Sequence, residues 1–303
     1  MRSFSILNFK VRRTLRENLS AFWMKCCYLL ILAMPFILLI GLLLKSSLLF
    51  GEHSLMELIF SSEWKPLSGK FGFFPFIISS LWVTFISIAI AAPVCLLTAI
   101  YLTQYAKRFV LKIMQPVIDI LAGIPSVIYG VWGIIIIVPF VSKVAGWFNV
   151  SSSGYSILTG AIVLAVMIIP FVLNILIEVY KTIPIELSEA SLSLGATKWE
   201  TIKKVLTRKA YPGIISSFGL GVSRAFGETI AVLMVVGNVV QIPSGIFQAG
   251  YPLPALIANN YGEMLSIPLY DSALMFAALI LFVVVTFFNM GSRYIIMHYE
   301  KKI

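Results

Sequence analysis

Six long apolar runs determine most of what this chain can fold into. A helix needs roughly 20 apolar residues to cross a bilayer core of about 30 Å. The runs are Cys26–Leu44, Phe73–Leu102, Ile113–Val141, Ile157–Ile177, Ile214–Val240 and Ala273–Ile296. Because only 12% of the 303 residues are charged, a soluble surface is excluded. We therefore predict an all-α membrane protein with about six transmembrane helices, and we expect tilt or an interfacial extension in the longer second, third and fifth runs.

The basic residues favour one orientation of these spans. If the N-terminus is cytoplasmic, 18 of the 23 Lys and Arg residues lie on the cytoplasmic side, 4 lie outside and Arg224 lies within a span. Cytoplasmic loops of membrane proteins carry such an excess, so we predict a multi-pass protein of the bacterial inner (cytoplasmic) membrane with both termini in the cytoplasm. Residues 1–25 would form a basic leader that contacts anionic lipid, and residues 26–72 the first transmembrane helix and an outside loop.

The polar segment at about 178–212 has the features of two short helices joined at a glycine. Pro184 precedes a helix-forming run whose first turns are acidic, as the helix dipole favours. Gly195 can end that helix in a left-handed conformation, and Thr197 with Glu200 has the spacing of a capping box. The segment is either a docking surface or an ordinary solvated helix pair. The residues that would dock are Glu186, Glu189, Ala190, Ser191, Gly195 and Ala196.

The fifth run contains two charged residues, Arg224 and Glu228. Charges within a membrane are costly and usually mark a pathway or an internal pair. A continuous helix would place the two on one face, where Glu228 could hold Arg224. Gly219, Ser223 and Gly227 share this spacing and predict close approach of another helix. Two interpretations remain open: Arg224 faces a passage and briefly binds an anion through its planar guanidinium, or the pair is self-neutralising and only fixes helix packing.

The third run contains a proline, Pro125, which should kink or break its helix. Ser126 and the backbone groups freed beside it could line a cavity, where irregular backbone is tolerated within a membrane. The alternative is a kinked helix that serves packing alone. Asp119, near the cytoplasmic end of this run, could pair with a nearby lysine.

Three motifs in these segments resemble those of one transporter family. Glu189-Ala190-Ser191, followed after three residues by Gly195, resembles the EAA loop of bacterial ABC-importer permeases, although Thr207-Arg208 replaces the usual Leu-Pro. Two segments resemble the signature of phosphate-importer permeases. One is Arg224-Ala-Phe-Gly-Glu-Thr-Ile-Ala-Val, and the other, in the third run, is Asp119-Ile-Leu-Ala-Gly-Ile-Pro-Ser-Val-Ile-Tyr-Gly-Val-Trp-Gly. The continuation Val-Leu-Met-Val-Val-Gly-Asn238 is similar to the PstC type, and the resemblance extends from about Phe73 to the C-terminus.

The resemblance implies an ABC-importer permease fold for residues 73–303, with cytoplasmic coupling helices in segment 178–212 that dock into a groove on an ATPase. It implies three partners: a PstA-type permease, a PstB-type ATPase dimer and an outside phosphate-binding protein. In the family that this chain resembles, the residues that match Arg224 and Glu228 are implicated in transport, and the predicted substrate-pathway residues are Arg224, Glu228, Thr229 and Ser126. Because the chain has no Walker-type Gly-x-x-x-x-Gly-Lys-Ser/Thr run, ATP and Mg²⁺ are expected on the ATPase. This chain is expected to be a transport subunit rather than an enzyme, with no metal, cofactor or nucleic acid of its own.

Three other functions remain open for a membrane protein of this kind. A permease for another oxyanion, such as sulfate or molybdate, would have the same architecture. An ion-coupled secondary transporter would need no ATPase, which the docking segment argues against. A membrane sensor that does not transport would lack uptake altogether.

Overall fold

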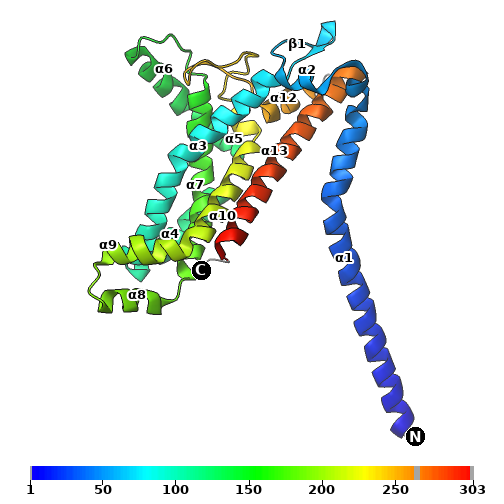
Figure 1. Ribbon diagram of the computed structural model, residues 1–303, viewed down its shortest axis with the longest axis vertical. Helices are drawn as coiled ribbons and strands as arrows, with labels where there is room; N and C mark the ends of the chain where they lie inside the picture. Colours follow the sequence, from blue (N-terminus) through cyan, green and yellow to red (C-terminus); the bar gives the residue numbers. More distant parts are fainter. Residues whose placement is uncertain (1, 263–266, 301–303) are drawn as a thin grey trace.

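The computed structural model describes the backbone of residues 2–262 and 267–300 and the side chains of residues 17–262 and 267–297. Regular structure in this part of the chain is almost entirely helical (Figure 1). The α-helices are α1 (Arg2–Glu52), α2 (Leu55–Phe60), α3 (Phe74–Ile100), α4 (Arg108–Gly123), α5 (Ser126–Trp132), α6 (Val138–Trp147), α7 (Ile157–Lys181), α8 (Ile185–Ser193), α9 (Lys198–Glu200), α10 (Thr207–Phe226), α11 (Ile230–Leu233), α12 (Leu253–Asn260) and α13 (Pro268–Glu300). An antiparallel hairpin pairs β1 (Trp64–Lys65) with β2 (Lys70–Phe71) around the 3₁₀ turn η1 (Pro66–Ser68).

Three π-helical segments join α-helices into longer rods. The segment η2 (Tyr101–Tyr105) extends α3, η3 (Gly133–Ile137) joins α5 to α6, and η4 (Thr201–Leu206) joins α9 to α10. The chain from Lys198 to Phe226 is therefore one continuous helix.

Five helical segments among the described residues are long and apolar enough to cross a membrane. They are Glu17–Glu52, Phe74–Tyr105, Ser126–Trp147, Ile157–Lys181 and Pro268–Met297. The fifth predicted run is present as α10 and α11 with an interruption between them. The prediction of an all-α membrane protein with about six spans is confirmed, but the fifth run is not one uninterrupted span.

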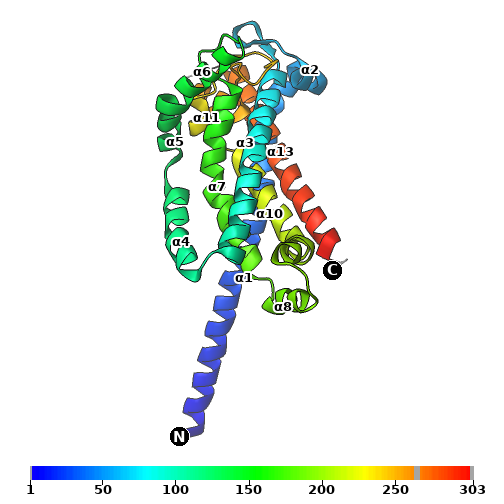
Figure 2. The same ribbon diagram turned by 90° about the vertical axis from the view of Figure 1, so that its left-hand side faces the viewer.

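Pro125 divides the third predicted run in two. Ile124 adopts an extended conformation (ψ 129°), as expected for a residue before proline, and α5 begins at Ser126. The membrane-spanning part therefore starts at Ser126 rather than at Ile113. The preceding α4 is a separate helix, which Figure 2 shows on one flank below α5.

The helix α7 lies at the centre of the bundle in both views (Figure 1, Figure 2). It packs against α3, α4 and α10. Most of its side chains are buried, including Leu164, Ile168 and Leu176. A helix that is mostly apolar and mostly buried belongs in a protein interior, so the neighbouring helices pack around α7.

The two ends of the molecule carry different features. The N-terminal end of α1, the end of α13 and α8 lie toward one end, and the β1–β2 hairpin, α2 and α12 lie toward the other (Figure 1, Figure 2). A second apolar cluster, which includes Leu49, Phe73 and Phe276, joins α1, α3, α12 and α13 at the hairpin end. From there α1 extends away from the other helices (Figure 1).

Candidate functional site

The helix that carries Arg224 ends two residues after it. The residues after Phe226 leave the helical path, with Gly227 as the C-cap and Thr229 at φ −108° and ψ −65° before α11 begins. Glu228 therefore does not lie one turn above Arg224. No ion pair joins the two in the described part of the chain, so the prediction that Glu228 holds Arg224 is wrong.

Arg224 instead lies over the ring of Phe171, which belongs to the central helix α7. The guanidinium carbon lies 4.6 Å from the ring centroid, within cation–π range. The arginine is exposed on the surface of the chain. No hydrogen bond or ion pair to its guanidinium is present among the described residues, so its N–H donors remain available.

Glu228 faces a separate cavity of about 10 Å³ between the helix break, α3 and the start of α12. Ser80 and Thr84 of α3 contribute hydroxyl groups to its lining, and such a volume is about that of one water molecule. The Ala231 N–H also donates to Glu228 Oε1 at 3.4 Å. Ser80 Oγ accepts the Leu253 N–H at 2.8 Å, which fixes α12 to α3 beside this cavity.

Ser126 and Thr229 stand at the starts of α5 and α11, which pack together. The contact is close because Gly130 lacks a side chain: a Cβ there would lie 3.3 Å from Ala231 Cα and 2.6 Å from Met234 Sδ. Thr229 Oγ1 donates to the Gly227 carbonyl at 3.3 Å. The structure thus packs together the two helices that begin at these residues, whereas it shows no hydrogen bond from Arg224 to either hydroxyl in the region it describes.

The small residues of α10 do approach another helix, as predicted, at two of the three positions. A Cβ at Gly219 would collide with Ser292 of α13, and Ser223 Oγ donates to Asn289 Oδ1 at 2.9 Å. A Cβ at Gly227 would meet only backbone of the preceding turn.

Asp119 pairs with an amide rather than with a lysine. Asn174 Nδ2 of α7 donates to Asp119 Oδ1 at 2.9 Å, and Gln115 Nε2 donates to Asn174 Oδ1 at 2.7 Å. These bonds fix α4 to α7. The predicted lysine pair is therefore wrong.

The docking segment has the predicted local geometry at its glycine and its cap. Gly195 follows α8 with φ +85°, and Thr197 and Glu200 form a complete capping box. Hydrogen bonds from the backbone N–H and hydroxyl of Thr197, together with Lys204, lower the pKa of the Glu200 carboxyl to about 2. The second predicted short helix is wrong, because α9 continues through η4 into α10 without a break.

The residues predicted to dock lie on the outer surface of this segment. Glu186, Glu189, Ala190 and Gly195 are exposed, and Ser191 and Ala196 are half-buried. Large apolar side chains are exposed beside them, and the sequence reasoning missed these: Ile185, Leu192, Leu194 and Trp199. Apolar residues in the most polar loop of the chain were a signal that could have identified them, since exposed apolar patches mark interaction sites.

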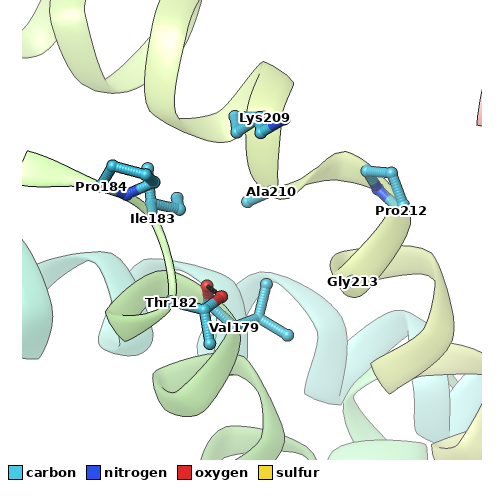
Figure 3. Close-up of a pocket in the computed structure, with 8 residues that line it drawn as sticks. All are labelled: Val179, Thr182, Ile183, Pro184, Lys209, Ala210, Pro212 and Gly213. Carbon is cyan, nitrogen blue, oxygen red and sulfur yellow. Dashed lines mark hydrogen bonds between the residues drawn. The ribbon is translucent and has the colours of Figure 1, made fainter. Parts of the chain in front are cut away.

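A pocket of about 300 Å³ lies where the segment leaves and rejoins the bundle (Figure 3). Figure 3 shows Pro184 and Ile183 on one side and Lys209, Ala210 and Pro212 on the other. The residues that line it are Val179, Thr182, Ile183, Pro184, Lys209, Ala210, Pro212 and Gly213. The pocket thus lies between the C-terminal end of α7 and the N-terminal part of α10.

One contact ties the docking segment to the bundle, and a second joins α8 to η4 within the segment. Lys198 Nζ lies 4.6 Å from the centroid of the Tyr105 ring at the end of η2. The hydroxyl oxygens of Ser191 and Thr201 lie 2.9 Å apart, at hydrogen-bond distance, and join α8 to η4. A displacement of α8 would therefore reach both α3 and α10.

Comparison with known proteins identifies the kind of protein that has this arrangement. The family model described as binding-protein-dependent transport system inner membrane component matches residues 96–297. The chain belongs to this family. It is thus the permease subunit of an ABC importer, the component that forms the membrane passage and is not itself catalytic.

Several curated relatives match most of the chain. It is 36% identical to the probable ABC transporter permease protein YqgH of Bacillus subtilis, over 96% of this chain and 94% of that protein. It is 33% identical to the phosphate transport system permease protein PstC of Xylella fastidiosa, over 90% and 89% of the two chains. A probable PstC of Methanocaldococcus jannaschii is also 33% identical, over 82% and 84%.

The solved structures confirm the fold. A chain of the MetNI methionine ABC transporter, in an inward-facing conformation, has a TM-score of 0.53 and 22% identity, over 73% of this chain and 91% of that chain. At this identity the likeness concerns the permease fold alone.

Proposed function

We propose that this permease is the PstC-type subunit of an ATP-driven importer of inorganic phosphate. The observation that carries the proposal is the exposed Arg224, whose guanidinium lacks an anionic partner among the described residues. A guanidinium offers parallel N–H donors that suit the oxygens of phosphate. The PstC relatives, which match most of the chain, support phosphate as the anion.

Phosphate would meet Arg224 only briefly, because a transport site must release its ion as well as admit it. The hydroxyls of Ser126 and Thr229, at two adjoining helix starts, would line the same passage. Glu228, which faces the small cavity at α3, would hold the helix break rather than neutralise Arg224.

The α8 end would lie in the cytoplasm of a bacterium together with both termini, and α8 would dock on a PstB-type ATPase that binds ATP and Mg²⁺. The six docking residues would contact it beside the exposed Leu194 and Trp199. Because the helix from Lys198 to Phe226 is continuous, movement of the docked segment would be carried to Arg224. A PstA-type permease and an outside phosphate-binding protein would complete the importer.

The experiment is uptake of radiolabelled phosphate in cells that lack their own phosphate importers and carry the partner subunits. We expect wild type to restore uptake and Arg224→Ala to abolish it at equal membrane levels and equal ATPase association. Arg224→Lys is the matched control, because it retains the charge without the planar fork. Restored uptake with Arg224→Ala would show that Arg224 serves packing only.

The second candidate is a permease for sulfate or molybdate. The name of the Bacillus relative states no substrate, and Arg224 suits any small oxyanion. Competition by unlabelled sulfate and molybdate separates the candidates, since phosphate uptake should resist both. Uptake that needs no ATPase would instead favour an ion-coupled transporter.

A further inference from the structure

The partner of Arg224 is an aromatic ring rather than a carboxylate, and this difference has a chemical consequence. A carboxylate would occupy two guanidinium N–H donors and cancel the charge, so an incoming oxyanion would have to displace it. A ring face attracts the cation through its quadrupole and occupies no N–H donor. At 4.6 Å from the Phe171 centroid, the guanidinium is held while its donors stay free.

Phe171 lies beside a close contact between two helices. Gly221, one turn before Arg224, lets α10 approach α7: a Cβ there would lie 2.7 Å from Val172 Cγ2. Val172 is buried and is the neighbour of Phe171 in α7. The Gly221–Val172 contact thus keeps α10 close to α7 beside the Phe171 ring and the Arg224 guanidinium.

We propose that Phe171 is a positioning residue for anion transport: its ring holds the Arg224 guanidinium and leaves the N–H edge free for a tetrahedral oxyanion. This inference rests on the proposed function. Because the ring already restricts the Arg224 side chain, less conformational entropy is lost when the anion binds. The ring itself makes no contact with the anion. It therefore affects how often a transport cycle carries an anion, whereas assembly and ATP hydrolysis do not depend on it.

The test measures phosphate imported per ATP hydrolysed by the complete importer, with its ATPase and binding protein, in proteoliposomes. We expect Phe171→Leu to lower this ratio about two- to fivefold, the range given by a cation–π contact at an exposed site. Phe171→Trp should retain it, because indole offers a better ring face. Phe85→Leu, at an exposed phenylalanine of α3 with no cation over its ring among the described residues, is the matched control and should not change it.

Each remaining result decides between the inference and the proposed function. If wild type imports phosphate and Phe171→Leu matches it while Arg224→Ala is inactive, Phe171 does not position Arg224 and only the proposed function stands. If Leu and Trp at position 171 lower ATP hydrolysis and import equally, Phe171 is a packing residue and the inference is also wrong. If wild type imports sulfate or molybdate instead, the phosphate assignment is wrong and the same ratio is measured with that anion. Import of no oxyanion overturns both.

Discussion

Replacement of Gly195 by alanine tests whether the left-handed backbone conformation at this position is needed for docking. Gly195 has φ +85°, and no atom lies within 4 Å of the position that a Cβ would take. A steric clash with neighbours is thus excluded, and the whole effect comes from the left-handed backbone. For an L-residue other than glycine this conformation costs roughly 1–2 kcal/mol. The docked geometry should therefore become about 5- to 30-fold less populated in Gly195→Ala.

The assay is the affinity of the purified ATPase for the permease complex in nanodiscs, compared with uptake in cells. Gly195→Asn should fall between Ala and wild type, because asparagine tolerates the left-handed region. Gly146→Ala is the matched control: that site is also open, but it lies inside α6, where alanine is favoured by about 1 kcal/mol. Wild-type affinity in Gly195→Ala would refute the reasoning, since the turn would then not be part of the docked state.

Two further predictions concern helix contact and pH. Gly221→Ala should destabilise the permease by about 1–3 kcal/mol, since its Cβ would overpack against buried Val172, and thermal unfolding in detergent measures this. Because the pKa of Glu200 is lowered from 4.5 to about 2, its capping box is fully stabilising above pH 4.5 and is lost only as pH falls toward 2. ATPase affinity should thus show no titration from Glu200 between pH 6 and 8; a titration there that Glu200→Gln removes would contradict this.

The docking segment shows how far local sequence signals reach. Gly195 and the Thr197–Glu200 capping box were predicted because each depends only on residues within one turn. The continuation of α9 into α10 was missed, since nothing local distinguishes a short helix from the start of a long one. The exposed Leu194 and Trp199 were missed because they do not belong to the motif that the segment resembles.

The sequence by itself determined the membrane class, the approximate spans and the break at Pro125. These depend on apolar length and on a missing N–H, which are properties of the chain wherever it folds. Only the tertiary structure decided the surroundings of Arg224. The spacing of Arg224 and Glu228 permits a helical pair, but in the folded protein α10 ends at Phe226 and Glu228 lines a cavity beside α3. The actual partner, Phe171, lies 53 residues earlier on α7, a helix that α10 approaches closely at Gly221.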